Sequence, residues 1–342
     1  MSLEDIINSY DPSAPLAEAS TIPASWYLDG DLTELERNTV FARSWQVVGR
    51  ADQVQEPGQY ISCNVAGAPL VVVRGGDGKL RGFFNVCRHH AAAVMTEPAG
   101  KASQLQCPYH GWTYSLEGEL KTAPDLGGIC NFDRASMGLA AVEIAVWKCW
   151  ICAKLACGGS ALPDLPDLDV TVFHWAERRH YMMDCNWKVF VDNYLDGGYH
   201  VPHLHKGLNR LLDYSDYQID LGERYCLQWS PFREGGRALY YWIYPNFMVN
   251  RYPDAMDTNL VLPRGVNQTE VIFDFYFTDG SDAARVAASE AIQEEDAAIC
   301  KSVQSGLASR AYTSGRLSVR REAGEHLFHR LLHSDLKSGP DG

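Results

Sequence analysis

Two short pairs of metal-binding side chains restrict the fold of this chain more than any other feature of its sequence. Cys87 and His89 form the first pair, and Cys107 and His110 form the second, with 17 residues between the pairs. Segments rich in β-branched and aromatic residues, separated by glycine-rich turns, surround both pairs, as is typical of a small antiparallel β domain. Two neighbouring loops of such a domain can bring two thiolates and two imidazoles to one metal centre.

This set of ligands suits a 2Fe–2S cluster of the Rieske arrangement, in which two cysteines hold one iron and two histidines hold the other. Trp112 closely follows the second pair and is expected to shield such a cluster. A structural zinc site is the alternative, because zinc also accepts two cysteines and two histidines. Zinc fingers usually place both cysteines before both histidines, so the spacing favours the cluster. His90 is expected to pack or to contact solvent rather than to bind metal.

A second concentration of possible ligands lies between residues 186 and 205. His200 and His205 have Pro202 between them, so we expect a helix bearing His200 to break and return His205 toward the same point. Two histidines and one carboxylate, with coordination positions left open, form the facial triad of non-haem Fe(II) oxygenases. O2 and a substrate require those open positions.

The third ligand is expected from a long helix predicted over about residues 282–308. Ile292, Ile299 and Val303 form an apolar stripe at helical spacing. Asp296 falls near the centre of this stripe and Glu295 nearer its flank. An acid on the core side of a helix requires a partner, and a metal ion would supply one. The alternative interpretation is the acidic face of a solvated helix.

The composition changes along the chain and predicts its organisation. Residues 1–44 are expected to pack on the C-terminal domain, and residues 45–157 to form the all-β cluster domain. The stretch 158–170 is rich in Gly, Pro and Asp and is the best linker candidate. Residues 158–342 are expected to form an α+β domain that holds the mononuclear iron.

The charge balance and the cysteine content limit the partners and the compartment. The chain has 30 Lys+Arg against 43 Asp+Glu, a net charge of −13, and no basic run, which argues against nucleic acid. No apolar stretch approaches the roughly 20 residues that span a bilayer, and the N-terminal sequence lacks a signal or transit pattern. We therefore expect a cytoplasmic protein whose ten cysteines are thiols or metal ligands rather than disulfides.

The two motifs together, CRH…CPYHGW and NYLDGGYHVPHLH, resemble the large (alpha) subunit of Rieske non-haem iron oxygenases. The resemblance runs over most of the chain. Within the family, the segments YPNFMVNRY and EEDAAICKSVQSGL are most similar to choline monooxygenase and its bacterial relatives.

This resemblance implies an all-β Rieske domain, a helix-grip catalytic domain with an antiparallel sheet, and a ring-like homotrimer. In such rings the cluster of one subunit delivers electrons to the iron of its neighbour through a bridging carboxylate. That carboxylate usually lies three residues before the first histidine ligand, where this chain has Gly197. Asp196 is therefore the candidate for the bridge and Asp192 the fallback, while Asn193 matches the family's asparagine beside the iron.

The expected activity is monooxygenation with O2 and with electrons from a separate NAD(P)H-dependent reductase, a ferredoxin or flavin component. The sequence contains no GxGxxG dinucleotide motif, which agrees with a reductase on another chain. If the resemblance extends to the substrate, the target is a quaternary ammonium compound such as choline, betaine or carnitine, hydroxylated or N-demethylated.

Aromatic faces bind such cations, and the run LYYWIYPNF offers them. Strand alternation places Tyr240, Trp242 and Tyr244 on one face, and Phe247 ends the run. Core packing is the alternative role for each of these four residues.

Three other functions remain open from the sequence. An alpha subunit that hydroxylates aromatic rings would need an equally apolar pocket. A Rieske electron carrier would need the first ligand set only, and a zinc-binding scaffold would need no iron.

Overall fold

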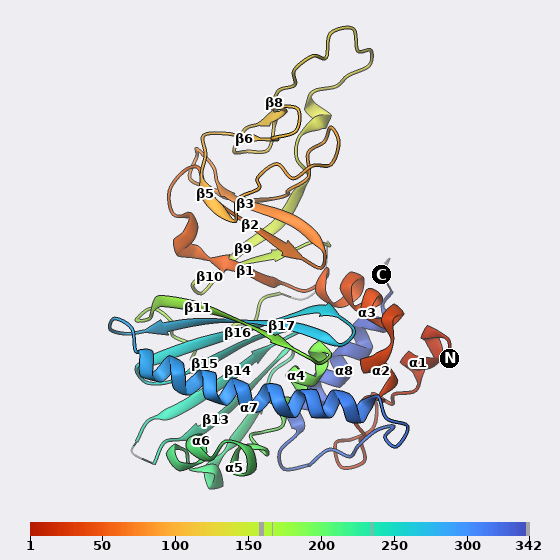
Figure 1. Cartoon of the computed structure of the whole chain (residues 1–342), viewed down its shortest axis with the longest axis vertical. Helices are drawn as coiled ribbons and strands as arrows, with labels where there is room; N and C mark the ends of the chain where they lie inside the picture. Colours follow the sequence, from red (N-terminus) through yellow and green to blue (C-terminus); the bar gives the residue numbers. More distant parts are fainter. Residues whose placement is uncertain (157–160, 166, 234, 340–342) are drawn as a thin grey trace. The chain divides into compact units, whose positions relative to one another are not determined.

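The computed structural model describes residues 1–156, 161–165, 167–233 and 235–339. The chain divides into two compact units, one formed by Phe41–Leu162 and the other by Met1–Val40 together with Pro163–Gly342. The N-terminal segment therefore folds with the C-terminal half of the chain (Figure 1). The linker candidate at 158–170 falls partly outside the described residues.

The β unit, Phe41–Leu162, contains a seven-stranded antiparallel sheet in the order β1-β10-β9-β4-β3-β2-β5 and a three-stranded sheet β6-β7-β8. Its strands are β1 (Gln46–Arg50), β2 (Gln59–Val65), β3 (Ala68–Arg74), β4 (Leu80–Phe84), β5 (Ala99–Lys101), β6 (Leu105–Gln106), β7 (Thr113–Tyr114), β8 (Leu120–Thr122), β9 (Ala141–Trp147) and β10 (Trp150–Lys154). Two 3-10 helices, η2 (Ala51–Val54) and η3 (Ala135–Met137), interrupt the connections.

Strand β3 lies inside the large sheet and is buried on both faces, which explains its continuous apolar run. Val71 and Val73 pack in the cluster that contains Cys87 and Cys107. Val72, which points the other way, packs with residues of a separate cluster. One face of the sheet thus supports the loops that carry the Cys and His pairs.

The α+β unit is built on a second seven-stranded antiparallel sheet in the order β11-β17-β16-β15-β14-β13-β12. Strands β12 to β17 form a meander, and β11 pairs with β17 at one edge. The strands are β11 (His174–Met183), β12 (Gln218–Leu221), β13 (Tyr225–Pro231), β14 (Arg237–Ile243), β15 (Phe247–Arg251), β16 (Ala255–Gly265) and β17 (Gln268–Phe277).

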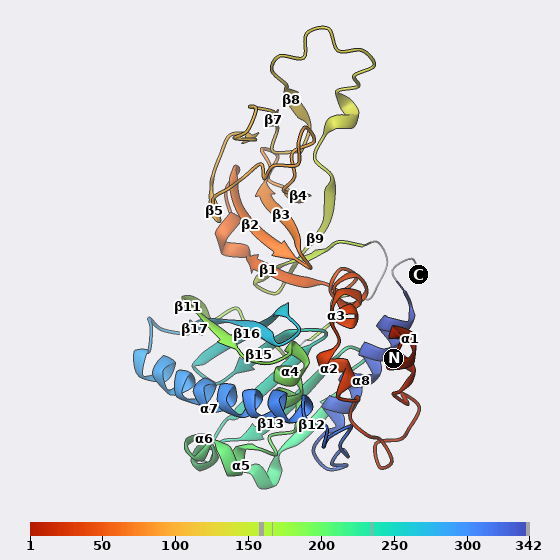
Figure 2. The same cartoon turned by 45° about the vertical axis from the view of Figure 1, so that its right-hand side comes forward.

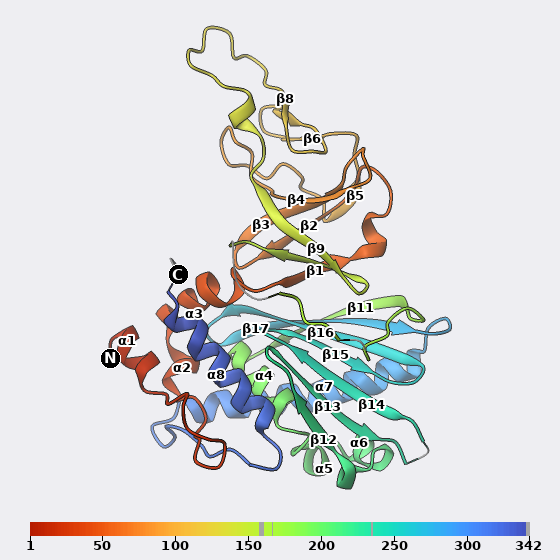
Figure 3. The ribbon, with the colours of Figure 1, turned by 180° about the vertical axis from the view of Figure 1, so that it is seen from behind.

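Three longer helices, α4 (Trp187–Leu195), α7 (Ala283–Leu307) and α8 (Ala323–Lys337), pack on this sheet. Helix α4 contacts β16 and lies between α7, which reaches β11, and α8, which reaches β12. Helix α7 crosses in front of the sheet in Figure 1 and behind it in Figure 3. Mixed helices on an antiparallel sheet, beside an all-β unit, confirm the predicted fold class. The shorter elements are α1 (Leu3–Asn8), α2 (Ser25–Leu28), α3 (Gly30–Glu36), η1 (Arg37–Phe41), α5 (Val201–Leu204), α6 (Lys206–Leu211) and η4 (Tyr214–Asp216).

The N-terminal helices hold α4 in place. Helix α1 contacts α8, and α2 contacts α7 (Figure 2). At the end of α3, the fully buried carboxylate of Glu36 accepts a hydrogen bond from Trp187 Nε1 at 2.8 Å and pairs with Lys188 Nζ at 2.5 Å. Removing one partner of a buried pair costs about 3–5 kcal/mol. The pair therefore fixes the helix whose C-terminal end leads to His200.

Candidate functional site

The two loops that carry the Cys and His pairs are copies of one turn. In the first loop the carbonyl of Cys87 accepts a hydrogen bond from Ala91 N at 3.0 Å, and in the second the carbonyl of Cys107 accepts one from Gly111 N at 3.1 Å. Both donors have positive φ, 60° for Ala91 and 72° for Gly111. Ala91 holds a conformation that L-residues adopt at a cost of about 1–2 kcal/mol, and such strain is concentrated at functional sites.

These turns bring the predicted side chains together. The rings of His89 and His110 lie 4.7 Å apart, and Trp112 stacks on His89 at 4.8 Å with an interplanar angle of 3°. The thiols of Cys87 and Cys107 are buried. Burial raises the pKa of the Cys107 thiol, as does the adjacent Cys87, while backbone N–H groups of Tyr109 and His110 oppose the shift.

The donor set fits a 2Fe–2S cluster. His89 Nδ1 is buried and makes no hydrogen bond in the described part of the chain, which is expected of a nitrogen kept for a metal. The hydroxyl of Tyr114 lies 3.3 Å from Cys87 Sγ, where it can donate to a thiolate ligand. His90 also lies near, with its ring 4.0 Å from that of His89.

The second ligand set lies where α4 ends. Gly197 and Gly198 have φ values of 68° and 66°, and these values, rather than Pro202, end the helix. This corrects the expected break, because Pro202 sits in the first turn of α5, where its missing N–H costs nothing. A Cβ at position 197 would lie 2.1 Å from the carbonyl oxygen of Arg321, so no carboxylate can stand there.

His200, His205 and Asp296 meet beneath this turn, with their ligand atoms within 4.8 Å of one another. Nε2 of His205 lies 3.1 Å from Asp296 Oδ1, and Nε2 of His200 lies 4.0 Å from the same oxygen. Asn193 donates to Asp296 Oδ1 at 2.9 Å. Two imidazoles and one carboxylate facing a single point have the geometry that a facial triad requires.

Each imidazole is held from behind by a second carboxylate. Nδ1 of His200 lies 2.6 Å from Asp196 Oδ2, and Nδ1 of His205 lies 2.6 Å from Glu295 Oε2. This fixes the tautomer that leaves Nε2 free to bind metal. Burial lowers the pKa of His205, but Asp296 and Glu295 outweigh it and raise the pKa overall.

The prediction of a buried apolar stripe on α7 was wrong. Ile299 and Val303 are 38% and 44% exposed. The buried face of α7 is half polar and comprises Val286, Gln293, Asp296, Cys300, Gln304 and Leu307. Asp296 is buried because this face contacts α4, whose Asn193 binds it.

Asp192 lies away from the triad. Its carboxylate accepts hydrogen bonds from Tyr27 Oη at 2.6 Å and from His329 Nε2 at 3.0 Å. Asp196, in contrast, touches His200 both through the ring and through the backbone N–H at 3.0 Å. The structure thus distinguishes the two aspartates by their partners.

A cavity of about 110 Å³ opens on the triad and is lined by tyrosines. The rings of Tyr214 and Tyr217 stack at 5.6 Å, and those of Tyr240 and Tyr252 meet edge to face at 6.2 Å. No Lys or Arg occurs among the described residues that line it. The lining includes five tyrosines: Tyr194, Tyr214, Tyr217, Tyr240 and Tyr252.

Besides Asp296, a second buried acid, Asp257 on β16, lines this cavity. Its Oδ1 accepts hydrogen bonds from Asn250 at 2.7 Å and from Asn259 at 3.2 Å. Burial raises the pKa of Asp257 to about 6, against the opposing effect of the two amides. At neutral pH the cavity therefore carries a negative charge beside its aromatic wall.

Of the four aromatic residues proposed for substrate binding, Tyr240 alone is among the described residues that line this cavity. Trp242, on the same face of β14, and Tyr244, just past the end of that strand, contact Phe328 of α8, with ring centroids 5.5 and 6.5 Å away. Phe247 pairs with Ile243 and so lies on the opposite face. Alternation predicts the face correctly, but it does not predict where α8 covers the strand.

The sequence analysis did not single out the other cavity residues. Tyr214 and Tyr217 follow the histidine motif, but no spacing marks them. The sequence does contain one indication of Asp257. An acid inside a strand of apolar and β-branched residues must find a buried partner or a ligand.

Two family models match the chain, a Rieske [2Fe-2S] domain over residues 44–133 and the catalytic domain of a ring hydroxylating alpha subunit over 172–219 and 213–338. The chloroplastic choline monooxygenase of Arabidopsis thaliana is 39% identical, covering 98% of this chain and 87% of that protein. The chain belongs to the Rieske non-haem iron oxygenases. The predicted resemblance is therefore confirmed.

Two further relatives of this Rieske oxygenase are similar over nearly their whole length. The carnitine monooxygenase oxygenase subunit of Escherichia coli (strain K12) is 29% identical, covering 94% of this chain and 95% of that protein. The quaternary ammonium Rieske monooxygenase CntA, crystallised with L-carnitine, superposes with a TM-score of 0.82 at 26% identity, over 99% of each chain.

Membership assigns the chain to the Rieske non-haem iron monooxygenases, with a 2Fe–2S cluster and a mononuclear iron as cofactors. In the described residues, no helix has the length and apolar character needed to cross a bilayer.

Proposed function

We propose that this Rieske oxygenase inserts one oxygen atom of O2 into a small quaternary ammonium compound, with choline as the preferred substrate. One observation carries the proposal. The triad of His200, His205 and Asp296 opens on a cavity that combines five tyrosines with the buried carboxylate of Asp257. Aromatic faces and a desolvated anion are what a cation without N–H donors requires.

The charge of the cavity favours choline over its zwitterionic relatives. Betaine and carnitine carry a carboxylate, and the described lining offers no Lys or Arg to receive it. The hydroxyl of choline can instead bond to the amides of Asn250 and Asn259, which also line the cavity. The guanidinium of Arg285 favours the charged form of Asp257. An uncharged aromatic ring would add no further counter-charge, which argues against an aromatic substrate.

We assign the cluster to Cys87, Cys107, His89 and His110, with Trp112 covering one imidazole, and the iron to the triad. The cluster supplies single electrons, and the iron supplies O2 activation. Asn193 and Glu295 hold Asp296 and His205 in position, because each donates to or accepts from a ligand. Asp196 is our candidate for the bridge, since its carboxylate contacts His200.

We further propose a homotrimer with electron transfer between subunits, a separate NAD(P)H-dependent reductase, and a cytoplasmic location. The description of the CntA structure refers to inter-subunit electron transfer in that protein. The nine cysteines within the described residues are free thiols, which suits a reducing compartment.

The test is substrate-dependent O2 consumption with a generic reductase and NADH. Choline should stimulate uptake and yield the aldehyde hydrate, whereas betaine, carnitine and naphthalene should give little turnover. Formaldehyde from any of the amines would indicate N-demethylation. Coupled turnover with naphthalene, or with carnitine in preference to choline, would contradict the proposed substrate.

A further inference from the structure

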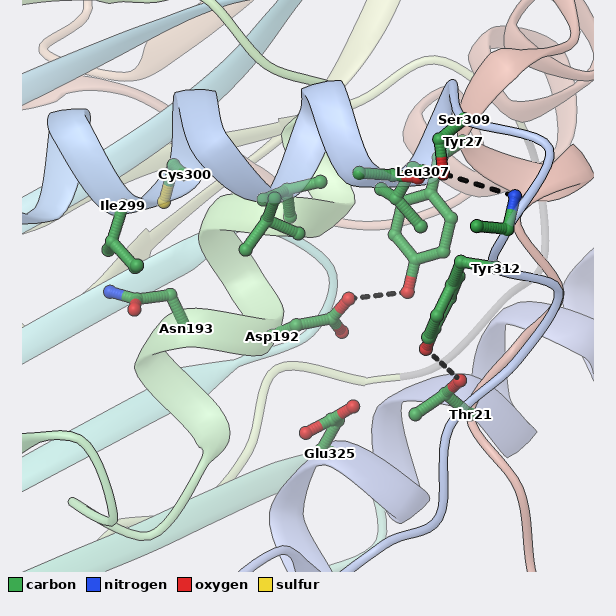
Figure 4. Close-up of a pocket in the computed structure, with 14 residues that line it drawn as sticks. Thr21, Tyr27, Asp192, Asn193, Ile299, Cys300, Leu307, Ser309, Tyr312 and Glu325 are labelled. Carbon is green, nitrogen blue, oxygen red and sulfur yellow. Dashed lines mark hydrogen bonds between the residues drawn. The ribbon is translucent and has the colours of Figure 1, made fainter.

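A second and larger cavity, of about 460 Å³, is lined by residues of α4, α7 and α8 (Figure 4). Tyr27, Asp192, Tyr312 and Glu325 contribute its polar and aromatic wall, and Asn193 lines both cavities. The aliphatic wall comes from α4 and α7 and includes Val189, Ile299, Val303 and Leu307. No Lys or Arg occurs among its described lining residues.

The two carboxylates of this cavity are satisfied unequally. Asp192 accepts hydrogen bonds from Tyr27 Oη at 2.6 Å and from His329 Nε2 at 3.0 Å. Glu325 is only 7% exposed, and its carboxyl group makes no hydrogen bond in the described part of the chain. His329 Nε2 lies 3.9 Å from Glu325 Oε1, but its proton is donated to Asp192. In Figure 4 Glu325 points toward Asp192 across the cavity.

The cluster of Asp192, Glu325 and His329 is a poor metal site. Ile22 N donates to His329 Nδ1 at 3.4 Å, so Nε2 carries the ring proton and donates to Asp192. To bind a metal, Nε2 of His329 would have to lose its proton. The ring proton would then sit on Nδ1, and the hydrogen bond from Ile22 N would be lost. A ligand that supplies positive charge without needing the imidazole fits better.

We infer that this cavity binds a small organic ammonium ion, with Glu325 as its counter-ion and the rings of Tyr27 and Tyr312 and the aliphatic wall around its alkyl groups. A buried carboxylate that accepts no hydrogen bond is costly to ionise, and a bound cation would offset that cost. Aromatic faces and aliphatic side chains suit a cation with apolar substituents better than a hydrated alkali ion. The inference does not depend on the substrate proposed for the triad.

Proton release gives this site a distinctive signature. Burial, with the charges of Asp192, Glu322 and Asp196, raises the pKa of Glu325 well above its usual value. A bound cation favours the charged form of this carboxyl group, so binding should release a proton over the pH range in which Glu325 titrates. The titratable groups around Glu325 come from several elements. They are Tyr27 on α2, Asp192 and Asp196 at α4, Tyr312 in the loop after α7, and Glu322 and His329 at α8.

The experiment is calorimetric titration of tetramethylammonium into the full-length, metal-loaded protein without reductase. It is done in the D257N background, where the cavity at the triad is disabled. We expect one site per chain, with proton release detected by comparing buffers of different ionisation enthalpy. E325Q should weaken this binding at least tenfold and abolish the proton release.

Val303→Arg provides a second variant in case E325Q folds poorly. Val303 is 44% exposed and lines the cavity, so an arginine there can occupy it without entering the core. Ser302→Arg is the matched control, because Ser302 is exposed on the same helix and is not among the lining residues. Loss of binding in V303R but not in S302R supports the site. Undiminished binding in both E325Q and V303R, or no binding in the D257N background, overturns it.

Discussion

The carboxylate of Glu295 lies 2.6 Å from Nδ1 of His205, on the side of the ring opposite to Asp296. Two consecutive residues of one helix thus contact both nitrogens of a single imidazole. Glu295 is 45% exposed at its side chain, so its contribution is to orient the ring rather than to supply a buried charge.

Replacing Glu295 by Gln should weaken iron binding about 10- to 100-fold, as loss of a carboxylate behind a histidine ligand typically does. The measurement is iron per chain after dialysis against a graded chelator. Glu294→Gln, at the exposed neighbouring position, is the control and should keep its iron. Equal iron retention in both variants would contradict a role for Glu295.

Asp196 and Asp192 should differ in electron transfer. Asp196→Asn removes the carboxylate that contacts His200, and we expect reoxidation of the reduced cluster by substrate and O2 to slow about 10- to 100-fold. Asp192→Asn changes a carboxylate bound to Tyr27 and His329 and should leave that rate unchanged. Stopped-flow absorbance of the cluster follows both rates, and iron content must be equal. The reverse order would make Asp192 the bridge.

Asp257→Asn should abolish choline-dependent turnover while stabilising the protein at high pH. The folded pKa of about 6 lies above the ordinary value of 3.8, so the stability that protonation of Asp257 provides is complete below about pH 4 and is lost as the pH rises through 6. The variant should therefore gain up to about 3 kcal/mol over the wild type at pH 8, and less at pH 5.

Urea unfolding of iron-free protein at pH 5, 6.5 and 8 measures this difference. Asp279, an exposed residue just past β17, gives the control variant D279N, whose stability difference should not change with pH. If the stability gained by D257N over the wild type were the same at every pH, or larger at pH 5 than at pH 8, the assigned burial cost of Asp257 would be refuted.

Gly111→Ala and Ala91→Gly test the paired turns of the cluster domain. A Cβ at position 111 meets nothing closer than Pro124 Cγ at 3.6 Å, so the cost of G111A is that of backbone strain at φ 72°, about 1–2 kcal/mol. A91G removes the same strain and should be neutral or stabilising. The denaturant midpoint for loss of visible cluster absorbance measures both effects. Destabilisation by A91G would contradict the assignment of backbone strain to Ala91.

Much of the fold could be predicted from the sequence, as could the candidates for the two ligand sets, because metal ligands occur at short, fixed spacings along the chain. Cys87, His89, Cys107 and His110 could be found in this way, as could His200 and His205. Asp296 was chosen for a reason that proved wrong, since its helix buries amides and a thiol rather than an apolar stripe.

The substrate cavity was harder to predict because its residues come from many separate elements. Asp257 on β16 and Tyr217 beside η4 meet Tyr240 only after the sheet has formed. The position of Trp242 depends on where α8 crosses β14, and strand alternation contains no information about that crossing.

Strand β14 serves two purposes along one face. Tyr240 in the middle of the strand borders the cavity, while Trp242 near its end and Tyr244 just past it pack against α8. A mutation that reshapes the substrate chamber can thus be confined to the part of the strand that bears no helix. Laboratory evolution could therefore change which amines the protein accepts without disturbing the packing of α8 on the sheet.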